Sequence, residues 1–210
     1  TEEALLTWCT KKIGRPVKWT ATRTEAFQLD AHGRDHITKA EMGFDNDGKI
    51  VALRVKTFAN LGAYLSTFGS CIPTYLHGTL LQGLYTTPKI NVDVTAVFTH
   101  TTVVDAYRGA GRPEATYLLE RLVDLAALEM NVDPAELRFK NFIPPFDGVN
   151  QPGYQTQVAL QYDSGNYKGV LEKGLQMLGY ADLRNAQKES AKNGKLLGVG
   201  FSTYIEACGI

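Results

Sequence analysis

The stretch Ala106-Tyr107-Arg108-Gly109-Ala110-Gly111-Arg112-Pro113-Glu114 joins the two most regular patterns in the sequence. Apolar and polar residues alternate through 89–99, which is the pattern of a half-buried β-strand. Residues 113–130 instead place apolar side chains three and four positions apart, which predicts a helix with one apolar face. We therefore predict a strand, a tight glycine-rich turn and a helix N-terminus, in that order.

This turn has the chemistry of an anion-binding site. The first turn of a helix leaves about four backbone N–H groups unpaired and carries the positive end of the helix dipole. Gly109 and Gly111 can adopt positive φ angles and let a ligand approach the backbone, and Arg108 and Arg112 add permanent positive charge. From these residues alone, an ordinary helix start flanked by two solvated arginines is an equally good interpretation. The spacing matches neither GxGxxG nor GxxxxGK.

Composition and charge exclude several classes of function. The chain has 210 residues, 44% of them hydrophobic, with 22 Lys+Arg against 22 Asp+Glu. It can build a core, and its net charge favours neither nucleic acid nor a membrane surface. Cys9, Cys71 and Cys208 form no CxxC pattern, which argues against a disulfide framework and favours a cytoplasmic location. No signal peptide or membrane-spanning run is apparent.

Periodicity along the rest of the chain predicts an α+β fold. Helices are expected at 1–13, 113–130, from 134 onward, 166–178 and 181–193, and strands at 15–22, 36–44, 49–60, 89–99 and 196–206. Because strands come first and helices cluster later, we expect a mixed β-sheet with helices packed on one side, either as one unit or as a strand-rich part (1–105) and a helix-rich part (106–210). The irregular segment 61–87 is predicted to be a functional or interface loop, and 143–161 an extended crossing segment.

Conventional catalytic and metal sites are weakly represented. Residues 45–48, Asp-Asn-Asp-Gly, lack the spaced ligands of a calcium loop and are predicted to form a hairpin turn. His32, Asp35 and His36 would share a face only on a helix, which the strand pattern after them disfavours, so a solvated loop is the preferred interpretation over a metal site. His77 is isolated in sequence and is predicted to be packed or on the surface.

Several motifs resemble a known family. The turn has the form Tyr-Arg-Gly-x-Gly followed by Pro-Glu-Ala, and further matches lie at 1–23, 60–64, 133–138 and 162–165. Together they resemble the molybdenum-binding subunit of the molybdenum hydroxylase (xanthine oxidase/aldehyde oxidase) family, and within it the large chains of the carbon monoxide dehydrogenase type. The resemblance covers nearly the whole chain. It implies that residues 1–210 are an internal fragment of the first molybdopterin-binding lobe.

The resemblance also implies a chemistry. In this family a molybdenum ion held by a pterin oxidises an electrophilic carbon with water as the oxygen source, and a glutamate acts as general base; the protein positions and tunes the cofactor. Carried onto this sequence, the cofactor-binding residues are Arg108, Gly109, Ala110 and Gly111, with the backbone at Arg108 near the molybdenum. Backbone donors suit this task because they are fixed before charge develops.

Two departures from family patterns bear on the substrate pocket. Ala110 stands where xanthine-oxidising members place a stacking phenylalanine, and Leu76 falls where they keep a substrate arginine, so purines are not expected. Carbon monoxide dehydrogenases of the family hold copper on a cysteine at the position of Gly109. Because Gly109 offers no thiolate for Cu(I), no copper is expected. A small carbonyl or heterocyclic substrate fits better than carbon monoxide.

The resemblance further implies iron–sulfur (FeS cluster) and flavin (FAD) partner subunits, a molybdenum-molybdopterin cofactor in its cytosine dinucleotide form, and a dimer of heterotrimers. The Gly-Gly-x-Phe-Gly-x-Lys segment and the base glutamate of the family are expected outside this chain. Glu114 and Glu206 stand in the wrong context to replace that base, so no catalytic residue is expected here and the isolated fragment is predicted to be inactive.

Two alternatives of other kinds stay open from the residues. One is a non-catalytic anion-binding or assembly module of a multi-subunit oxidoreductase, in which segment 61–87 packs on partner chains. The other is a phosphate or nucleotide binder at the helix start near Pro113.

Overall fold

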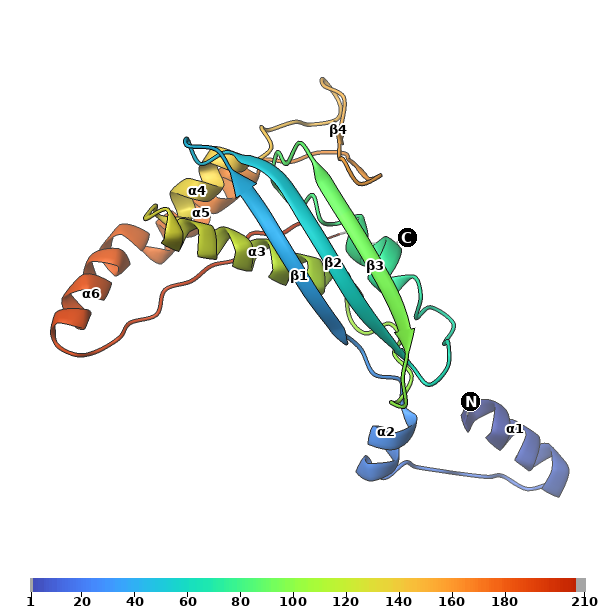
Figure 1. Cartoon of the computed structure of the whole chain (residues 1–210). Helices are drawn as coiled ribbons and strands as arrows, with labels where there is room; N and C mark the ends of the chain where they lie inside the picture. The colour runs from blue at the N-terminus through green and yellow to red at the C-terminus, as the bar shows by residue number, and fades with distance from the viewer. Residues whose placement is uncertain (1, 207–210) are drawn as a thin grey trace.

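A computed structural model of the chain describes residues 2–206. Its elements, in order, are α1 (Glu2–Ile13), α2 (Arg23–Leu29), β1 (His36–Phe44), β2 (Ile50–Gly62), the one-turn π-helix η1 (Ile72–Leu76), β3 (Ile90–Phe98), α3 (Arg112–Glu129), α4 (Pro134–Asn141), β4 (Tyr154–Gln155), β5 (Gln161–Tyr162), α5 (Tyr167–Leu178) and α6 (Tyr180–Lys192). Figure 1 shows one long sheet, with α3, α4 and α5 behind it and α1 and α2 beyond one end. None of the helices within residues 2–206 is long and apolar enough to cross a membrane.

The three-stranded sheet is mixed, as predicted. Strand β2 lies in the centre, antiparallel to β1 and parallel to β3. The β1–β2 connection is the predicted hairpin turn, in which one carboxylate oxygen of Asp45 accepts the N–H groups of Asp47, at 3.0 Å, and Lys49, at 2.8 Å. Such a side-chain turn replaces backbone hydrogen bonds that a tight reversal cannot make. The carboxylate is therefore used by the turn itself.

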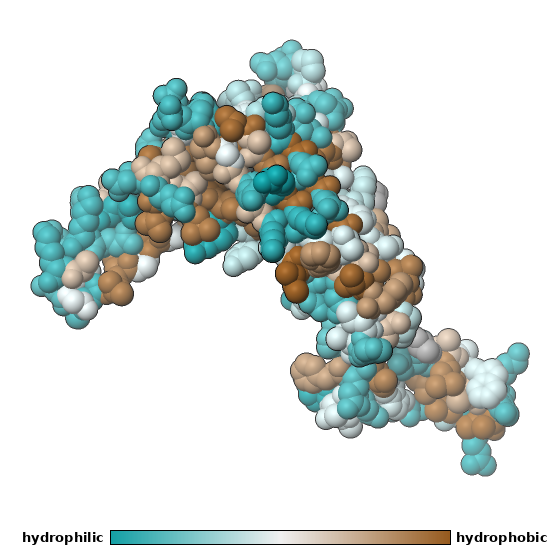
Figure 2. Space-filling view, in the orientation of Figure 1, coloured by the Kyte–Doolittle hydropathy of each residue, from teal (hydrophilic) through white to brown (hydrophobic). Residues whose placement is uncertain are grey.

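Helix α3 covers one face of the sheet. Its Ala115, Leu118 and Leu119 pack with Leu53 and Val55 of β2 in a buried apolar cluster. A second cluster continues this core through α4 and α5. The opposite face of the sheet is open to solvent and mixed in character. It carries the exposed ion pairs Arg54–Glu41 and Lys56–Asp93 together with the exposed apolar side chains Ile37 and Phe58, and Figure 2 shows hydrophilic and hydrophobic groups side by side on the surface. The expectation of helices on one side of a mixed sheet is confirmed.

Segment 61–87, predicted to be a functional or interface loop, is an exposed loop only in part. Only its first part is largely exposed, including Tyr64, Leu65 and Phe68. From η1 onward it is core: Leu76, Leu80, Leu81, Leu84 and Tyr85 are all at most 6% exposed. The periodicity is irregular because a π-helix and successive turns, instead of one helix, carry these side chains inward.

Two predicted strands do not form. Residues 15–22 are extended but unpaired, and the chain then enters α2, whose capping box pairs Thr22 with Glu25. Residues 196–206 run extended without joining the sheet, and the Thr203 N–H donates to the Glu120 carboxylate at 2.6 Å instead of to a strand. Alternation alone does not make a strand, because each strand also needs a neighbouring backbone.

The helical predictions hold in type and differ by a residue or two at their ends. Asp133 caps α4 by accepting the Ala135 N–H at 2.8 Å, and Asn131, just after α3, adopts a left-handed conformation with φ +54°. Segment 143–161 contains one half of the small β4–β5 hairpin. Cys208 lies outside the described residues; Cys9 and Cys71 are free thiols.

Candidate functional site

The turn before α3 has the predicted conformation. Gly109 and Gly111 both have φ +83°, and Arg108 has φ +20°. The Ala110 N–H donates to the Tyr107 carbonyl and the Arg112 N–H to the Gly109 carbonyl, both at 3.1 Å. Helix α3 then begins at Arg112, and its N-cap, Gly111, supplies no side chain to the first N–H groups. The turn therefore leaves the positive end of α3 uncapped by protein side chains.

Gly111 is required by close packing. A Cβ atom added there would lie 2.6 Å from the Ile72 carbonyl oxygen and 2.8 Å from the backbone nitrogen of His77, closer than van der Waals contact permits. The turn is thus seated on the backbone at the end of η1. This contact explains why the sequence needs glycine here in addition to the positive φ angle.

The structure brings the predicted site residues together to different degrees. Gly109 and Ala110 are half-buried in the turn, and the side chain of Arg108 is exposed. Leu76 lies beside them: its carbonyl carbon would be 3.0 Å from a Cβ at Gly111. The Leu76 side chain is 6% exposed and belongs to the interior of the chain. The substrate-pocket assignments of Ala110 and Leu76 stay predictions.

Two charged residues beside the turn were missed by sequence reasoning. Arg34 donates a hydrogen bond to the Arg108 carbonyl and lies 3.8 Å from the Glu114 carboxylate. Glu206 pairs with Arg112 at 3.3 Å, so this carboxylate is held by a guanidinium. Neither residue belongs to a recognisable motif, and they lie far from the turn in sequence.

A cavity of about 450 Å³ opens behind the turn, between β1 and α3. It is lined by Arg34, His36, Thr38, Ala40, His77, Glu114, Tyr117, Leu118, Arg121 and Leu122. His77 is 1% exposed, which confirms it as a packed histidine, and its ring centroid is 5.5 Å from that of His36. Neither ring nitrogen of His77, nor either carboxylate oxygen of Glu114, makes a hydrogen bond of normal geometry to the described residues.

Burial lowers the pKa of both imidazoles. Burial lowers the pKa of His77 to about 4, and the nearby His36 acts in the same direction. Burial also lowers the pKa of His36, against the opposing charges of Glu114 and Asp35. His32 is separate from this pair: its ring nitrogen lies 3.2 Å from the Phe27 carbonyl. Residues 2–206 contain no group of three or more His, Cys, Asp or Glu side chains placed to hold a metal ion.

His77 is expected to make stability depend on pH. Between its folded pKa of about 4 and its ordinary value of 6.5, the unfolded chain binds a proton that the folded chain does not. The free energy of unfolding should therefore fall as the pH drops through this window, by about 2 kcal/mol at about pH 5. We expect the free energy of unfolding of His77→Gln, measured with urea, to change much less between neutral and acidic pH. The matched control His100→Gln, at an exposed position, should keep the pH dependence of the parent. Equal pH dependence in His77→Gln and the parent would exclude the buried neutral imidazole.

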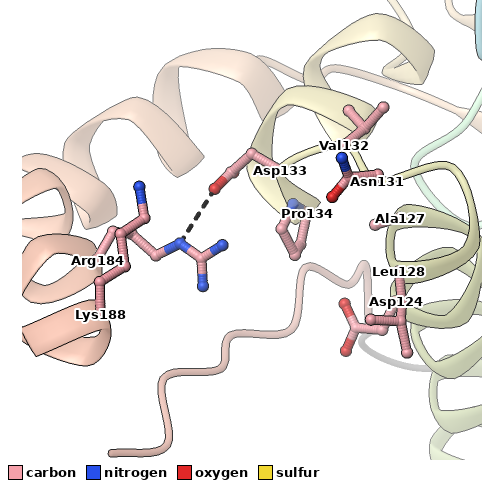
Figure 3. A pocket seen from close by; sticks show the side chains of 9 residues that line it. All are labelled: Asp124, Ala127, Leu128, Asn131, Val132, Asp133, Pro134, Arg184 and Lys188. Atoms are coloured by element: carbon pink, nitrogen blue, oxygen red, sulfur yellow. Dashed lines mark ion pairs between the residues drawn. The ribbon is translucent and has the colours of Figure 1, made fainter. Parts of the chain in front are cut away.

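A larger hollow, about 600 Å³, lies away from the turn between α6 and the α3–α4 connection (Figure 3). The Asp133 and Arg184 side chains that line it already have structural partners. Asp133 caps α4, pairs with Arg184 at 3.3 Å and accepts the Tyr180 hydroxyl at 2.9 Å. Size alone therefore does not make this hollow the functional site.

Comparison with known proteins shows the family of the chain. A family model described as a molybdopterin cofactor-binding domain matches residues 1–142. The chain belongs to this family. The Arg108–Gly111 turn lies within the matched range, and the resemblance seen in the sequence is confirmed.

Relatives and solved structures of this family are subunits of molybdenum hydroxylases. The chain is 37% identical to the carbon monoxide dehydrogenase large chain of Hydrogenophaga pseudoflava over 94% of its own length and 25% of that protein. It is 29% identical to subunit gamma of the 6-hydroxypseudooxynicotine dehydrogenase complex of Paenarthrobacter nicotinovorans, over 100% of its length and 26% of that subunit. The chain thus spans about a quarter of the length of these relatives.

The fold agrees with the same group of proteins. Quinoline 2-oxidoreductase from Pseudomonas putida 86 superposes with a TM-score of 0.87 and 26% identity, covering 97% of this chain and 25% of that one. Reconstituted CO dehydrogenase from Oligotropha carboxidovorans superposes with a TM-score of 0.76 and 30% identity, covering 91% of this chain and 24% of that one. The α+β arrangement is therefore that of a molybdenum-cofactor-binding domain.

Proposed function

We propose that this chain is part of the first molybdenum-cofactor lobe of a molybdopterin-dependent oxidoreductase large subunit, with the backbone of Arg108–Gly111 at the metal end of the cofactor. The observation that carries the proposal is the turn itself. It has two glycines at φ +83°, an uncapped helix N-terminus and a seat on η1 that excludes a side chain at Gly111. A negatively charged, oxygen-rich group fits such a set of backbone donors and neighbouring arginines.

The residues of this chain bind and orient; the cofactor supplies the oxidation chemistry when bound. The fixed backbone of the turn offers donors whose direction does not change during reaction, which is how charge is stabilised without reorganisation. The ion pair with Glu206, at 3.3 Å, restrains the Arg112 guanidinium and keeps it beside the turn. We assign no catalytic residue to this chain, and the isolated 210-residue piece is proposed to be inactive.

The proposed substrate is a small carbonyl or heterocyclic compound. Relatives named for heterocycles, such as the nicotine 6-hydroxylase large subunit and quinoline 2-oxidoreductase, support this class. Ala110 would leave space where a larger side chain would stack on an aromatic substrate. Leu76, whose backbone adjoins the turn and whose side chain is buried beneath it, would offer no charged group to the substrate.

We propose that no copper accompanies the molybdenum. Gly109 carries no thiolate, and a Cβ there would come within 3.1 Å of the Pro113 ring at a φ of +83°. A cysteine at this position would therefore be strained in the present backbone, and Cu(I) prefers soft sulfur ligands. The solved carbon monoxide dehydrogenase titled as a Cu,Mo enzyme shows that copper does occur among structural neighbours, so this point needs a direct test.

Relatives named as subunits support a multi-subunit assembly. We propose a cytoplasmic enzyme with an iron–sulfur subunit and a flavin subunit, assembled as a dimer of heterotrimers, with the cofactor in its cytosine dinucleotide form. The alternative of an assembly module without cofactor loses support, because most of segment 61–87 from η1 onward is buried within the chain.

The metal content of the full-length subunit, co-expressed with its iron–sulfur and flavin partners, tests the proposal. We expect molybdenum in stoichiometric amount with the subunit and no copper above background, measured by inductively coupled plasma mass spectrometry. Molybdenum with stoichiometric copper would overturn the argument from Gly109. Absence of molybdenum from a correctly assembled complex would withdraw the cofactor role and favour the assembly module.

A further inference from the structure

Arg34 stands where the start of β1 meets the functional turn. Its backbone has φ +61°, a left-handed conformation unusual for a residue other than glycine. Just before it, the His32 N–H donates to the Val103 carbonyl at 2.9 Å, and the Asp105 N–H donates to the His32 carbonyl at 2.8 Å. The chain at 32–34 is therefore fixed alongside the residues that lead into the turn.

The Arg34 side chain makes three contacts that together span the turn. Its terminal nitrogen donates to the Arg108 carbonyl, its Nε lies 3.8 Å from the Glu114 carboxylate, and its guanidinium lies 5.1 Å from the centre of the Tyr107 ring. Tyr107 lies at the beginning of the turn, Arg108 lies within it, and Glu114 lies in the first turn of α3. A planar guanidinium can donate to a carbonyl, lie over an aromatic face and stay within ion-pair distance of a carboxylate at once, a geometry that a compact ammonium group does not offer.

The hydrogen bond to Arg108 has a consequence for the next peptide group. The structure contains no cis peptide bond. In a planar trans peptide the C=O of one residue and the N–H of the next point in opposite directions. Holding the Arg108 carbonyl toward Arg34 therefore turns the Gly109 N–H to the other side of the turn. Within residues 2–206 this N–H donates to no protein acceptor.

We propose that Arg34 is a positioning residue that aims the Gly109 N–H at the bound cofactor, acting through the Arg108 carbonyl, with Glu114 holding the guanidinium in place. This inference rests on the proposed function only in naming the molybdenum cofactor as the group that the Gly109 N–H faces. The clamp itself is a property of this chain and can be tested without any cofactor.

The first experiment measures backbone hydrogen exchange in the turn of the chain by mass spectrometry. The reporters are the Ala110 and Arg112 amides, which are hydrogen-bonded inside the turn at 3.1 Å. Arg34→Gln and Arg34→Lys should both speed their exchange by about tenfold or more, because a hydrogen bond from a charged donor is lost or weakened. Exchange in β2 should not change. The control, Arg54→Gln, removes an exposed ion pair on the far face of the sheet and should leave the turn unaffected.

The second experiment uses the full-length subunit with its partners. Arg34→Gln should lower molybdenum content severalfold, and the metal that remains should give an altered Mo(V) electron paramagnetic resonance spectrum; Arg34→Lys should keep more metal but share the altered spectrum. A merely structural role would change the amount of folded protein and not the spectrum. Arg54→Gln should match the parent in both.

The outcomes separate this inference from the proposed function. Unchanged exchange in both Arg34 variants would overturn the clamp, whatever the molybdenum content. Faster exchange with normal metal content and spectrum would overturn the aiming of the Gly109 N–H at the cofactor, even if the parent subunit contains molybdenum. If the parent itself binds no molybdenum, the proposed function fails, and the exchange result still decides the clamp.

Discussion

Gly111→Ala is expected to abolish molybdenum incorporation into the full-length subunit and to destabilise the chain by about 2–5 kcal/mol. Two costs add. The first is conformational, because φ is +83° and a Cβ atom is unfavourable there. The second is steric: the added carbon would lie 2.6 Å from one backbone atom, at Ile72, and 2.8 Å from another, at His77. Backbone atoms cannot swing away as a side chain can, so the turn itself must move.

Gly194 provides a matched control for the conformational cost. Its φ is +71°, and an added Cβ would meet nothing within 4 Å. Gly194→Ala should therefore lose about 1–2 kcal/mol, with normal molybdenum content. Urea unfolding of the chain and metal analysis of the full-length subunit check both variants. If Gly111→Ala behaves like Gly194→Ala in the two measurements, the turn is not seated as described and the cofactor does not depend on it.

Local sequence patterns predicted the structure correctly where an element is determined by residues close together in the sequence. The apolar stripe of 113–130, the helix of 166–178 and the Asp45 turn all specify structure within a few residues, and each formed as predicted. The sequence also located the candidate turn, because glycine spacing and a helix start lie next to each other in the chain.

Patterns failed where structure depends on distant partners. Residues 15–22 and 196–206 alternate like strands, but no neighbouring strand within residues 2–206 pairs with them. The site shows the same limit. Arg34 and Glu206 reach the turn only through the fold, since nothing in their local sequence distinguishes them from solvated charges. Long-range contacts of single side chains have no periodicity from which to predict them.

The second large effect is expected at Arg138, which is 0% exposed and carries a full charge into the core. It pairs with Glu120 at 2.9 Å and with Asp124 at 2.9 Å. Glu120 also accepts hydrogen bonds from the Tyr85 hydroxyl and, at 2.6 Å, from the Thr203 N–H. Burial raises the pKa of Tyr85, so its hydroxyl stays a donor. The network joins α3, α4, the segment after η1 and the C-terminal stretch.

Arg138→Met should therefore lower the free energy of unfolding by about 3–5 kcal/mol, because it leaves the Glu120 carboxylate buried without its cation. The exposed pair offers the contrast: Arg54→Met, which leaves Glu41 in solvent, should cost about 0–1 kcal/mol. Urea unfolding at neutral pH measures both. An Arg138→Met loss as small as that of Arg54→Met would show that Glu120 takes up a proton or finds water instead.

The double variant Arg138→Met with Glu120→Gln identifies the cause of the loss. Glutamine keeps the shape of Glu120 and carries no charge. Its single carbonyl oxygen can still accept from the Thr203 N–H, and the Tyr85 hydroxyl, which bonds the other carboxylate oxygen of Glu120, can instead accept from the amide NH2. The double variant should recover most of the stability lost in Arg138→Met, since an apolar and neutral replacement of a buried pair is often close to neutral. If it recovers nothing, lost packing of the Arg138 side chain is the cause. Recovery of stability should also restore the hold on Thr203 and keep Glu206, three residues further on, beside Arg112 at the turn.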